Sequence, residues 1–339
     1  MASPVETGAI VYRGDGIEAV HKAGVAVVNG DGTLVYLLGD PTEMFMARSS
    51  VKPFQAIPLV MTGGADRYQF SSKQLAITCA SHNGSDEHRE LVMSNLKAAG
   101  NQPSDLQCGA HWPLGMKERS EYPYHEEDKD PVRHNCSGKH SGFLALSRHL
   151  GEDVADYLNP AGKVQTMVKE AVAAMCEFPA SRIPVGVDGC SAPNFGLPLV
   201  NLALGFKKLA AGEARDPEMA KAVKRLRDAM LEYPKMISGE GRMDYDIARS
   251  FPGRLVCKIG AEAVEGIGLV DPPMGIAVKI LDGGERALGP VILEVLKQIG
   301  FITGTDGYPY LKRHERPEVR NNRNLLTGHV TASFRLQKL

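Results

Sequence analysis

The sequence predicts an α/β fold in which strands from both ends of the chain share one mainly antiparallel sheet flanked by helices. Strand patterns occur before residue 40 and return after residue 253, whereas apolar residues between about 70 and 250 recur mostly with helical spacing. No internal repeat or low-complexity linker separates these regions. We therefore expect one unit over 1–339, with its sheet part at about 1–48 and 251–339 and its helix-rich part at about 49–250.

The N-terminal region is expected to contain a hairpin over 24–38. Two apolar runs flank the turn sequence Asn-Gly-Asp-Gly at 29–32, whose residues tolerate positive φ. The apolar spacing then becomes helical, although Pro53 and Pro58 disfavour helical geometry at the residues before them. Because Pro53 fits only the start of a helix, we expect Ser49 at the mouth of that helix, with its hydroxyl exposed.

The remaining elements are predicted from apolar period and from flanking Gly and Pro residues. The clearest helical stretches of the middle region are 87–99, 142–151, 162–175 and 218–231. The later elements are strands at 254–258 and 275–280, a helix at about 288–299 and a last strand candidate at 327–336.

The composition is that of an ordinary globular protein. Its net charge is −1, and Lys and Arg form no basic stripe, which argues against nucleic acid or an anionic membrane surface as a partner. The N-terminus lacks the basic and apolar blocks of a signal peptide, and no apolar run approaches the roughly 20 residues of a membrane span. We therefore expect a cytoplasmic protein. Six cysteines without a C-x-x-C pair predict reduced thiols, and Cys176 and Cys257 are expected to be small buried apolar residues.

Three short motifs follow the order found in serine acyl enzymes that use lysine as the base. They are S-x-x-K at 49–52, S-x-N at 81–83 and K-x-G at 258–260. Each motif is weak alone, because Lys52 also fits a solvated helix lysine and Ser81 a turn after a helix. Their order favours catalysis. Side chains at i and i+3 share one face of a helical turn, which would bring Ser49 within hydrogen-bond reach of Lys52.

The chemistry of the motifs requires a neutral lysine. A serine hydroxyl must lose its proton to an adjacent base as it attacks, and an ammonium group cannot accept that proton. Burial and a second cation nearby lower a lysine pKa from about 10.4 by several units. Lys258 would be that second cation beside Lys52, and it would form a second pair with Ser81 to pass a proton to the leaving group.

A second group of residues is compatible with a soft metal ion. The segment 134–142 opens a predicted helix with small residues, and 184–193 is typical of a short strand that ends in a tight turn. Cys136 and His140, one helical turn apart, would join Cys190 as ligands of an ion such as zinc. Two cysteines more than 50 residues apart are a weak metal signal, however, and buried unpaired thiols are the simpler interpretation.

These motifs resemble the sequence blocks of the rhizobial-type, or class 3, L-asparaginases. The likeness extends over nearly the whole chain and depends on four blocks: Arg-Ser-Ser-Val-Lys-Pro at 48–53, Ala-Ser-His-Asn-Gly at 80–84, His-Asn-Cys-Ser-Gly-Lys-His at 134–140 and Asp-Gly-Cys at 188–190. The resemblance implies a fold similar to those of serine β-lactamases, DD-peptidases and glutaminases. It also implies a homodimer that hydrolyses L-asparagine to L-aspartate and ammonia through a serine acyl-enzyme.

The same resemblance implies roles for individual residues. Catalysis would be shared by two Ser-Lys tandems, which are Ser49 with Lys52 and Ser81 with Lys258. A zinc ion near the serines, with water completing its shell, would be held by Cys136, Lys139 and Cys190. Lysine binds a metal only when deprotonated, so we expect zinc binding to weaken as pH falls.

A small charged substrate needs a clamp for its carboxylate and an acceptor for its amine. Arg48 and Asp188 are chemically suited to these two roles, and Asn83 and His140 are further expected polar contacts. Asparagine and glutamine differ by one methylene, which a pocket distinguishes by only about 1–3 kcal/mol, so the sequence does not set that selectivity.

Two other functions stay open. A penicillin-recognising serine acyl enzyme would share the three motifs. It is opposed by the missing signal peptide, by His82 in place of the Asp of S-D-N, and by a third motif without the hydroxyl residue of K-T-G. A zinc-binding protein without catalytic activity would instead use only the cysteine segments.

Overall fold

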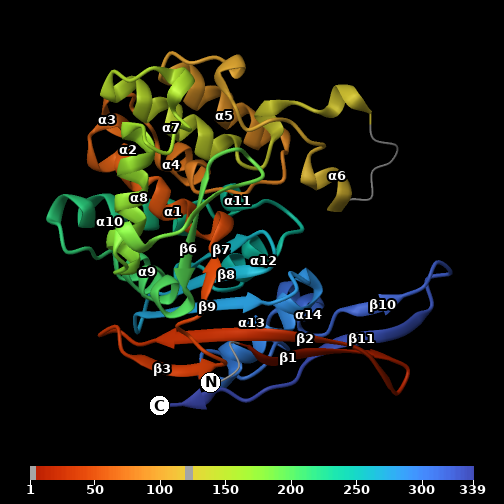
Figure 1. Ribbon diagram of the computed structural model, residues 1–339. Helices are drawn as coiled ribbons and strands as arrows, with labels where there is room; N and C mark the ends of the chain where they lie inside the picture. The colour runs from red at the N-terminus through yellow and green to blue at the C-terminus, as the bar shows by residue number, and fades with distance from the viewer. Residues whose placement is uncertain (1–4, 119–124) are drawn as a thin grey trace.

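The protein consists of a helix-rich lobe packed on one face of an antiparallel sheet, with further helices on the opposite face (Figure 1). The computed structural model describes residues 5–118 and 125–339. None of the helices within these ranges combines the length and the apolar character needed to cross a bilayer.

The main sheet has the strand order β10-β11-β1-β2-β9-β8-β7, and β3 pairs with both β2 and β12. All of these pairs are antiparallel. The strands are β1 Glu6–Arg13, β2 Gly16–Val28, β3 Leu34–Leu38, β7 Leu255–Gly260, β8 Val264–Leu269, β9 Met274–Ile280, β10 Glu318–Arg320, β11 Leu326–Ala332 and β12 Gln337–Lys338. Strands from both ends of the chain therefore build one sheet, which confirms the predicted fold class.

A small three-stranded sheet lies within the helix-rich lobe. It has the order β4-β6-β5 and consists of β4 Met44–Met46, β5 Val185–Val187 and β6 Pro193–Pro198. The helices of the lobe are α1 Lys52–Gln55, α2 Ile57–Met61, α3 Gly64–Arg67, α4 Ser72–Thr78, α5 Asp86–Ala98, α6 Leu114–Glu118, α7 Ser137–Leu150, α8 Lys163–Cys176, α9 Leu199–Ala211, α10 Pro217–Glu232, α11 Pro234–Ile237 and α12 Met243–Ser250. The C-terminal helices are α13 Glu285–Gln298 and α14 Pro309–Glu315.

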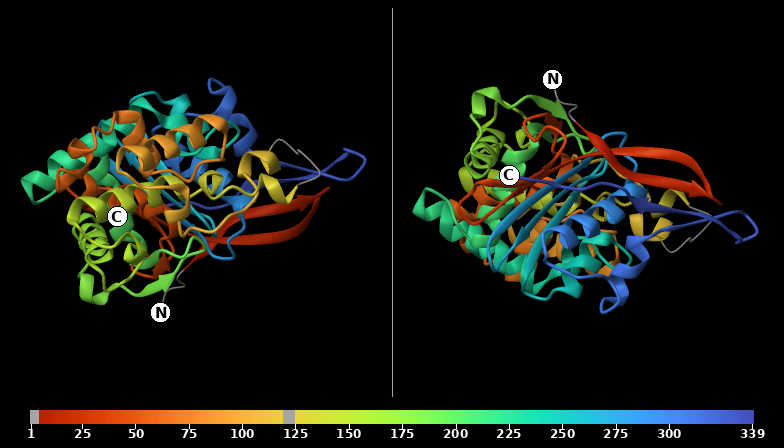
Figure 2. Two further views of the ribbon diagram at one scale, coloured as in Figure 1. Left: turned by 90° about the horizontal axis from the view of Figure 1, so that it is seen from above. Right: turned by 90° about the horizontal axis from the view of Figure 1, so that it is seen from below.

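The two faces of the sheet belong to two hydrophobic cores, as the side-chain alternation along β2 shows. Ala26 and Val28 lie in the core of the helix-rich lobe, whereas Val25 and Val27 lie in the core beneath α13. All four side chains are fully buried, as expected for a central strand covered on both faces. The view from below shows α13 crossing the face of the sheet turned away from the helix-rich lobe (Figure 2).

Glycines let α9 lie directly on the sheet. A Cβ atom at Gly266 of β8 would be 1.8 Å from the Phe206 ring, and one at Gly275 of β9 would be 1.9 Å from the Ala203 carbonyl oxygen. Neither position accepts a side chain without moving the helix. This close packing fixes β8 and β9 against the lobe, and with them the neighbouring strand β7, which carries Lys258.

Several elements differ from the sequence-based expectation. Strand β8 was not predicted, because its sequence Val-Glu-Gly-Ile-Gly-Leu contains two glycines, which are depleted in strands. The helix expected at 142–151 begins earlier, at Ser137, because its small N-terminal residues pack against α4. A Cβ atom at Gly138 would be only 2.1 Å from the Ile77 carbonyl oxygen.

Candidate active site

The three predicted motifs meet at one cavity of about 440 Å³ beside the end of β7. The residues that line it include Ser49, Ser81, Asn135, Arg242, Gly260 and Glu285. Ser49 comes from the short 3₁₀ turn Arg48–Val51, Ser81 from the segment after α4, and Gly260 from β7. Residues more than 200 positions apart in the sequence, such as Ser49 and Glu285, therefore surround the same space.

The turn that carries Ser49 is anchored to β6. The Ala47 amide donates to the Phe195 carbonyl oxygen at 2.8 Å, and the Arg48 amide donates to Asn194 Oδ1 at 3.0 Å. Arg48 has a φ of +52°, in the left-handed region that non-glycine residues rarely adopt. This sharp turn directs Ser49 to the cavity. The Ser49 hydroxyl takes part in no hydrogen bond with any described residue, so it is available to a ligand.

The glycine of the K-x-G motif has a steric role. A Cβ atom at Gly260 would be 2.8 Å from the Ala47 carbonyl oxygen and 3.1 Å from the Ser50 amide nitrogen. Both atoms belong to the segment that carries Ser49. Gly260 therefore allows the end of β7 to lie against the backbone of that turn.

Lys52 is fully buried and contacts Ser81 directly. Its Nζ donates to the Ala80 carbonyl oxygen at 2.6 Å and to Ser81 Oγ at 3.0 Å, and it lies 3.2 Å from Cys136 Sγ. Within the described residues, Lys52 forms no hydrogen bond with Ser49. The structure therefore pairs Lys52 with the serine of the second motif.

Lys258 is also fully buried, and its surroundings favour the neutral amine. Burial lowers its pKa to about 8; Asp244 opposes this shift, and the nearby Lys52 side chain acts in the same direction as burial. Lys258 Nζ donates to the Ile259 carbonyl oxygen at 2.6 Å and lies 3.8 Å from Asp244 Oδ2. No hydrogen bond joins Lys258 to Ser81 in the described structure. Near pH 8, a large fraction of Lys258 is able to accept a proton.

The S-x-N segment is held by the chain after α11. The Ser81 amide donates to the Ile237 carbonyl oxygen at 2.9 Å, and the Asn83 amide donates to the Ser238 carbonyl oxygen at 2.8 Å. The Asn83 side chain donates to the Glu240 carbonyl oxygen at 3.2 Å. Asn83 does not line the cavity, and these contacts fix the segment that leads into Arg242.

The predicted zinc ligands lie together. Lys139 Nζ is 3.1 Å from Cys190 Sγ, and Cys136 is hydrogen-bonded to Cys190. That bond, together with the nearby Lys52 and Lys139 side chains, holds the Cys136 pKa well below its usual range although burial opposes this. All three side chains are buried. Two sulfur atoms and one amine in a buried cluster form a suitable donor set for zinc.

Lys139 would have to lose a proton before it could bind a metal ion. Burial lowers its pKa, but Cys190 and Cys136 raise it more, so its pKa lies above the ordinary lysine value. Without a metal ion, this amine is therefore an ammonium group that compensates the negative charge of the Cys136 thiolate.

His140 is buried next to this cluster and does not line the cavity. Its Nδ1 forms a 2.7 Å hydrogen bond with the Tyr157 hydroxyl, and burial lowers its pKa to about 4. The Cys190 side chain counteracts this shift in part. His140 is therefore a neutral imidazole beside the sulfur atoms.

Arg48 and Asp188, which were expected to bind the carboxylate and the amine of the substrate, form an ion pair with each other. Arg48 Nη2 and Nε both lie 2.9 Å from Asp188 Oδ1. Burial raises the Asp188 pKa, but Lys139 and Arg48 lower it further, so the carboxylate is ionised at neutral pH. Neither residue lines the cavity of Ser49, and Arg48 instead lines a separate cavity of about 480 Å³.

Two charged residues of the cavity were not identified from the sequence. Arg242 precedes α12, and Glu285 is the first residue of α13. They place a cation and an anion in the same space as Ser49. Neither belongs to one of the motifs, and the only local signal is the glycine-rich sequence Ser-Gly-Glu-Gly-Arg at 238–242.

The comparisons with known proteins identify a family. The model of the L-asparaginase II family matches residues 9–332 of the chain. No curated protein matches the chain at a significant level.

Similar solved structures are distant in sequence. A structure described as Mglu in its glutamate form has a TM-score of 0.45 and 14% identity, over 82% of this chain and 60% of that one. A β-lactamase from Sphaerobacter thermophilus has a TM-score of 0.41 and 16% identity, over 84% and 93% of the two chains. A Bacillus glutaminase has a TM-score of 0.39 and 16% identity, over 82% and 90%.

The family match extends from β1 to the end of β11, so it includes all three motifs and both strand regions of the sheet. It confirms the family resemblance inferred from the motifs. The chain belongs to the L-asparaginase II family and is an amidohydrolase.

Proposed function

We propose that this protein is an L-asparaginase that forms an acyl-enzyme on Ser49. The observation that supports this most is the cavity that contains both motif serines, with the fully buried lysines Lys52 and Lys258 behind it. The Ser49 hydroxyl has no hydrogen-bond partner within residues 5–118 and 125–339, and it lies near buried amines. An acyl-transfer enzyme with a lysine base requires such an arrangement.

In the first half-reaction, the Ser49 hydroxyl oxygen attacks the side-chain amide carbon of asparagine. Lys52 receives the hydroxyl proton, and backbone amides of the turn stabilise the oxyanion. The C–N bond then breaks, and ammonia leaves after its nitrogen has gained a proton through Ser81. The 3.0 Å contact between Lys52 and Ser81 supports this relay.

In the second half-reaction, a water molecule attacks the ester. A neutral lysine accepts a proton from this water, the ester C–O bond breaks, and Ser49 regains its proton as L-aspartate leaves. Lys258 is suited to this step because burial favours its neutral form.

The substrate's charged groups have two candidate pairs of contacts. On chemical grounds Arg48 and Asp188 were expected in these two roles, with Asn83 and His140 as further polar contacts. The lining of the cavity favours Arg242 for the carboxylate and Glu285 for the amine, because both lie beside Ser49. We propose the second pair as the direct contacts. The Arg48–Asp188 ion pair then fixes the turn before Ser49.

We also propose that Cys136, Lys139 and Cys190 hold a zinc ion. The support is their buried donor set and the low pKa of Cys136. A zinc ion bound there would supply Lewis-acid chemistry next to the site. The cytoplasmic location and the homodimer are further proposals. The first rests on the sequence, and the second rests on the family resemblance.

Ammonia release from L-asparagine tests the proposed activity. We expect release by the intact protein, and a decrease of roughly three orders of magnitude or more in Ser49→Ala. Ser50→Ala is the matched control, because Ser50 donates to the Ala47 carbonyl oxygen and does not line the cavity. A folded intact protein that releases no ammonia but is labelled by a fluorescent penicillin would refute the asparaginase proposal in favour of a penicillin-recognising enzyme.

A further inference from the structure

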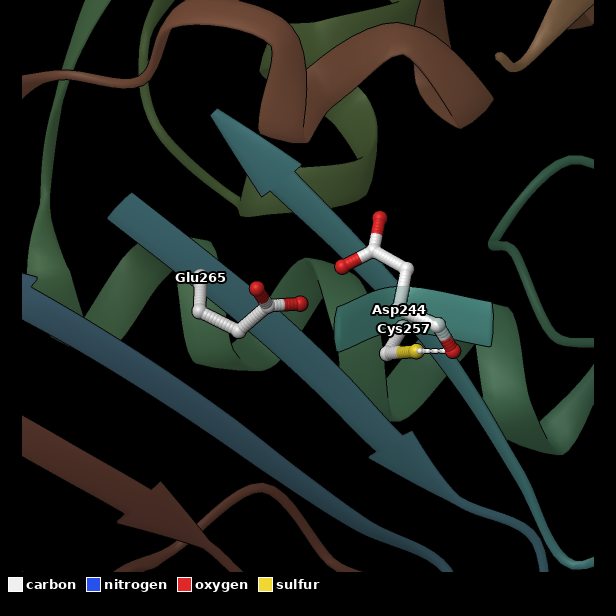
Figure 3. A group of neighbouring side chains, drawn as sticks. All are labelled: Asp244, Cys257 and Glu265. Atoms are coloured by element: carbon white, nitrogen blue, oxygen red, sulfur yellow. Dashed lines mark hydrogen bonds between the residues drawn. The ribbon is translucent and has the colours of Figure 1, made fainter. Parts of the chain in front are cut away.

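A buried group of acidic and thiol side chains lies behind Lys258. Asp244 of α12, Cys257 of β7 and Glu265 of β8 place their polar atoms within 4.8 Å of one another (Figure 3). Their exposed fractions are 2%, 4% and 0%. Two carboxyl groups removed from water in this way need compensation by hydrogen bonds, protons or cations.

Part of this compensation is visible for Asp244. Its Oδ2 accepts a 3.0 Å hydrogen bond from the Ile259 amide and lies 3.8 Å from Lys258 Nζ. Its Oδ1 and both carboxyl oxygens of Glu265 are buried without a hydrogen-bond partner among the described residues. Asp244 and Glu265 therefore both lie near Lys258. Because two carboxylates this close to each other repel, they cannot both be ionised without a large electrostatic cost.

The charged and titratable groups that act on Lys258 come from every element around it. They are Lys52 of α1, Cys79 after α4, Arg242 and Asp244 at the start of α12, Cys257 on its own strand and Glu265 of β8. Burial and the neighbouring Asp244 raise the Glu265 pKa well above its usual range. Of the two carboxyl groups, Glu265 is therefore the one that keeps its proton.

We propose that Glu265 is a neutral carboxylic acid that donates a hydrogen bond to Asp244 Oδ1, and that this pair positions Asp244 as the single anion next to Lys258. Figure 3 shows the Glu265 carboxyl pointing from β8 toward Asp244 and Cys257. The shared proton provides a partner for Asp244 Oδ1, which otherwise has none.

A metal ion is a poorer explanation of the same three side chains. The Cys257 thiol donates to the Asp244 carbonyl oxygen at 3.4 Å, and burial raises its pKa, so this sulfur stays protonated. A cation bound here would also lie close to Lys258, whose amine is positively charged below its pKa of about 8. A proton satisfies the oxygen atoms without adding that repulsion.

The pair has a consequence for the proposed reaction, on which this part of the inference rests. Asp244 opposes the effect of burial on the Lys258 pKa. A Glu265 that carries the proton adds no second negative charge beside Lys258, whereas an ionised Glu265 would raise the Lys258 pKa further. Glu265 is thus a positioning residue that acts through Asp244. By holding Asp244 in place, Glu265 keeps the Lys258 pKa at about 8, where the amine can both accept and release a proton.

Infrared spectroscopy of the unmodified protein at pH 7 tests the protonation of Glu265 without any use of activity. We expect the carbonyl stretch of a protonated carboxylic acid, and its loss in Glu265→Gln. An intact protein without this band would overturn the proposal, because Glu265 would then be ionised. This result is independent of whether the protein hydrolyses asparagine.

The pH dependence of kcat/KM provides the second test. We expect Asp244→Asn to move the Lys258-dependent limb to lower pH by roughly one unit or more, and Glu265→Gln to leave the limb in place. A shift of the limb in Glu265→Gln like that in Asp244→Asn would refute a neutral Glu265.

Metal analysis of Cys257→Ser completes the test. An unchanged metal content agrees with the proposal, whereas loss of a bound ion would show that the three side chains form a cation site. If no ammonia is released at all, the proposed function fails, and the infrared result still decides the state of Glu265.

Discussion

At the scale of single residues, the proposed reaction depends on the protonation of Lys258. This amine accepts a proton only when neutral, and burial lowers its pKa to about 8. We predict that kcat/KM for L-asparagine rises about tenfold per pH unit below pH 8 and levels off above it. A pH–rate profile measures this. A profile that is flat between about pH 6 and pH 9 would contradict the assignment of Lys258 as a proton acceptor.

Arg242 gives a second prediction at this scale. Because it lies in the cavity, Arg242→Gln should raise KM for L-asparagine by roughly tenfold or more, through loss of a charged hydrogen bond worth about 1.5–3 kcal/mol. Steady-state kinetics measure KM and kcat separately. Arg48→Gln is the comparison variant, and we expect it to lower kcat more than it raises KM, since it breaks the pair with Asp188. The reverse pattern would make Arg48 the substrate clamp.

The sequence motifs predicted part of this site and missed another part. Ser49, Ser81 and Lys258 were found because their chemistry and order form a recognisable pattern, and the structure brings them together. Arg242 and Glu285 form no pattern. They become neighbours of Ser49 only when two separate helices begin at the same cavity, which local spacing does not reveal.

At the scale of elements, the contact between β7 and the turn of Ser49 depends on a glycine. We predict that Gly260→Ala lowers kcat by roughly tenfold to a hundredfold, because its Cβ would displace a backbone that must be placed to within about 1 Å. Gly304→Ala is the matched control, since a Cβ atom there has open space around it. Activity assays and melting curves of both variants make the comparison. Equal activity in the two variants would show that the contact is not needed.

The elements themselves were predictable where one physical signal dominated. The hairpin around 29–32 follows from its turn residues, and β2 and β3 confirm it. Strand β8 was missed because its glycines serve the packing of α9, a tertiary requirement that overrides strand propensity. The apolar period alone placed the start of α7 too late, at residue 142, because Gly138 is required by the contact with α4.

At the scale of the whole molecule, the proposed zinc ligands link two distant segments. Cys136 precedes α7 and Lys139 lies in its first turn, whereas Cys190 belongs to the loop between β5 and β6. We predict roughly one zinc ion per chain in the intact protein. Cys190→Ser should lose most of this zinc and melt at a lower temperature, whereas the control Cys176→Ser should keep its zinc. Zinc affinity should fall as pH falls, because Lys139 must be deprotonated to bind. Metal analysis and calorimetry measure these effects, and active protein without zinc would remove the metal from the account.

The central claim is that Ser49 forms the covalent intermediate, and trapping that intermediate tests it most directly. The intact protein is mixed with L-asparagine, quenched with acid within the first turnover and digested for mass spectrometry. We predict an aspartyl ester on the peptide that contains Ser49, and none in Ser49→Ala. An ester on the peptide that contains Ser81 instead, or a Ser49→Ala variant that still releases ammonia at the rate of the intact protein, would contradict the account.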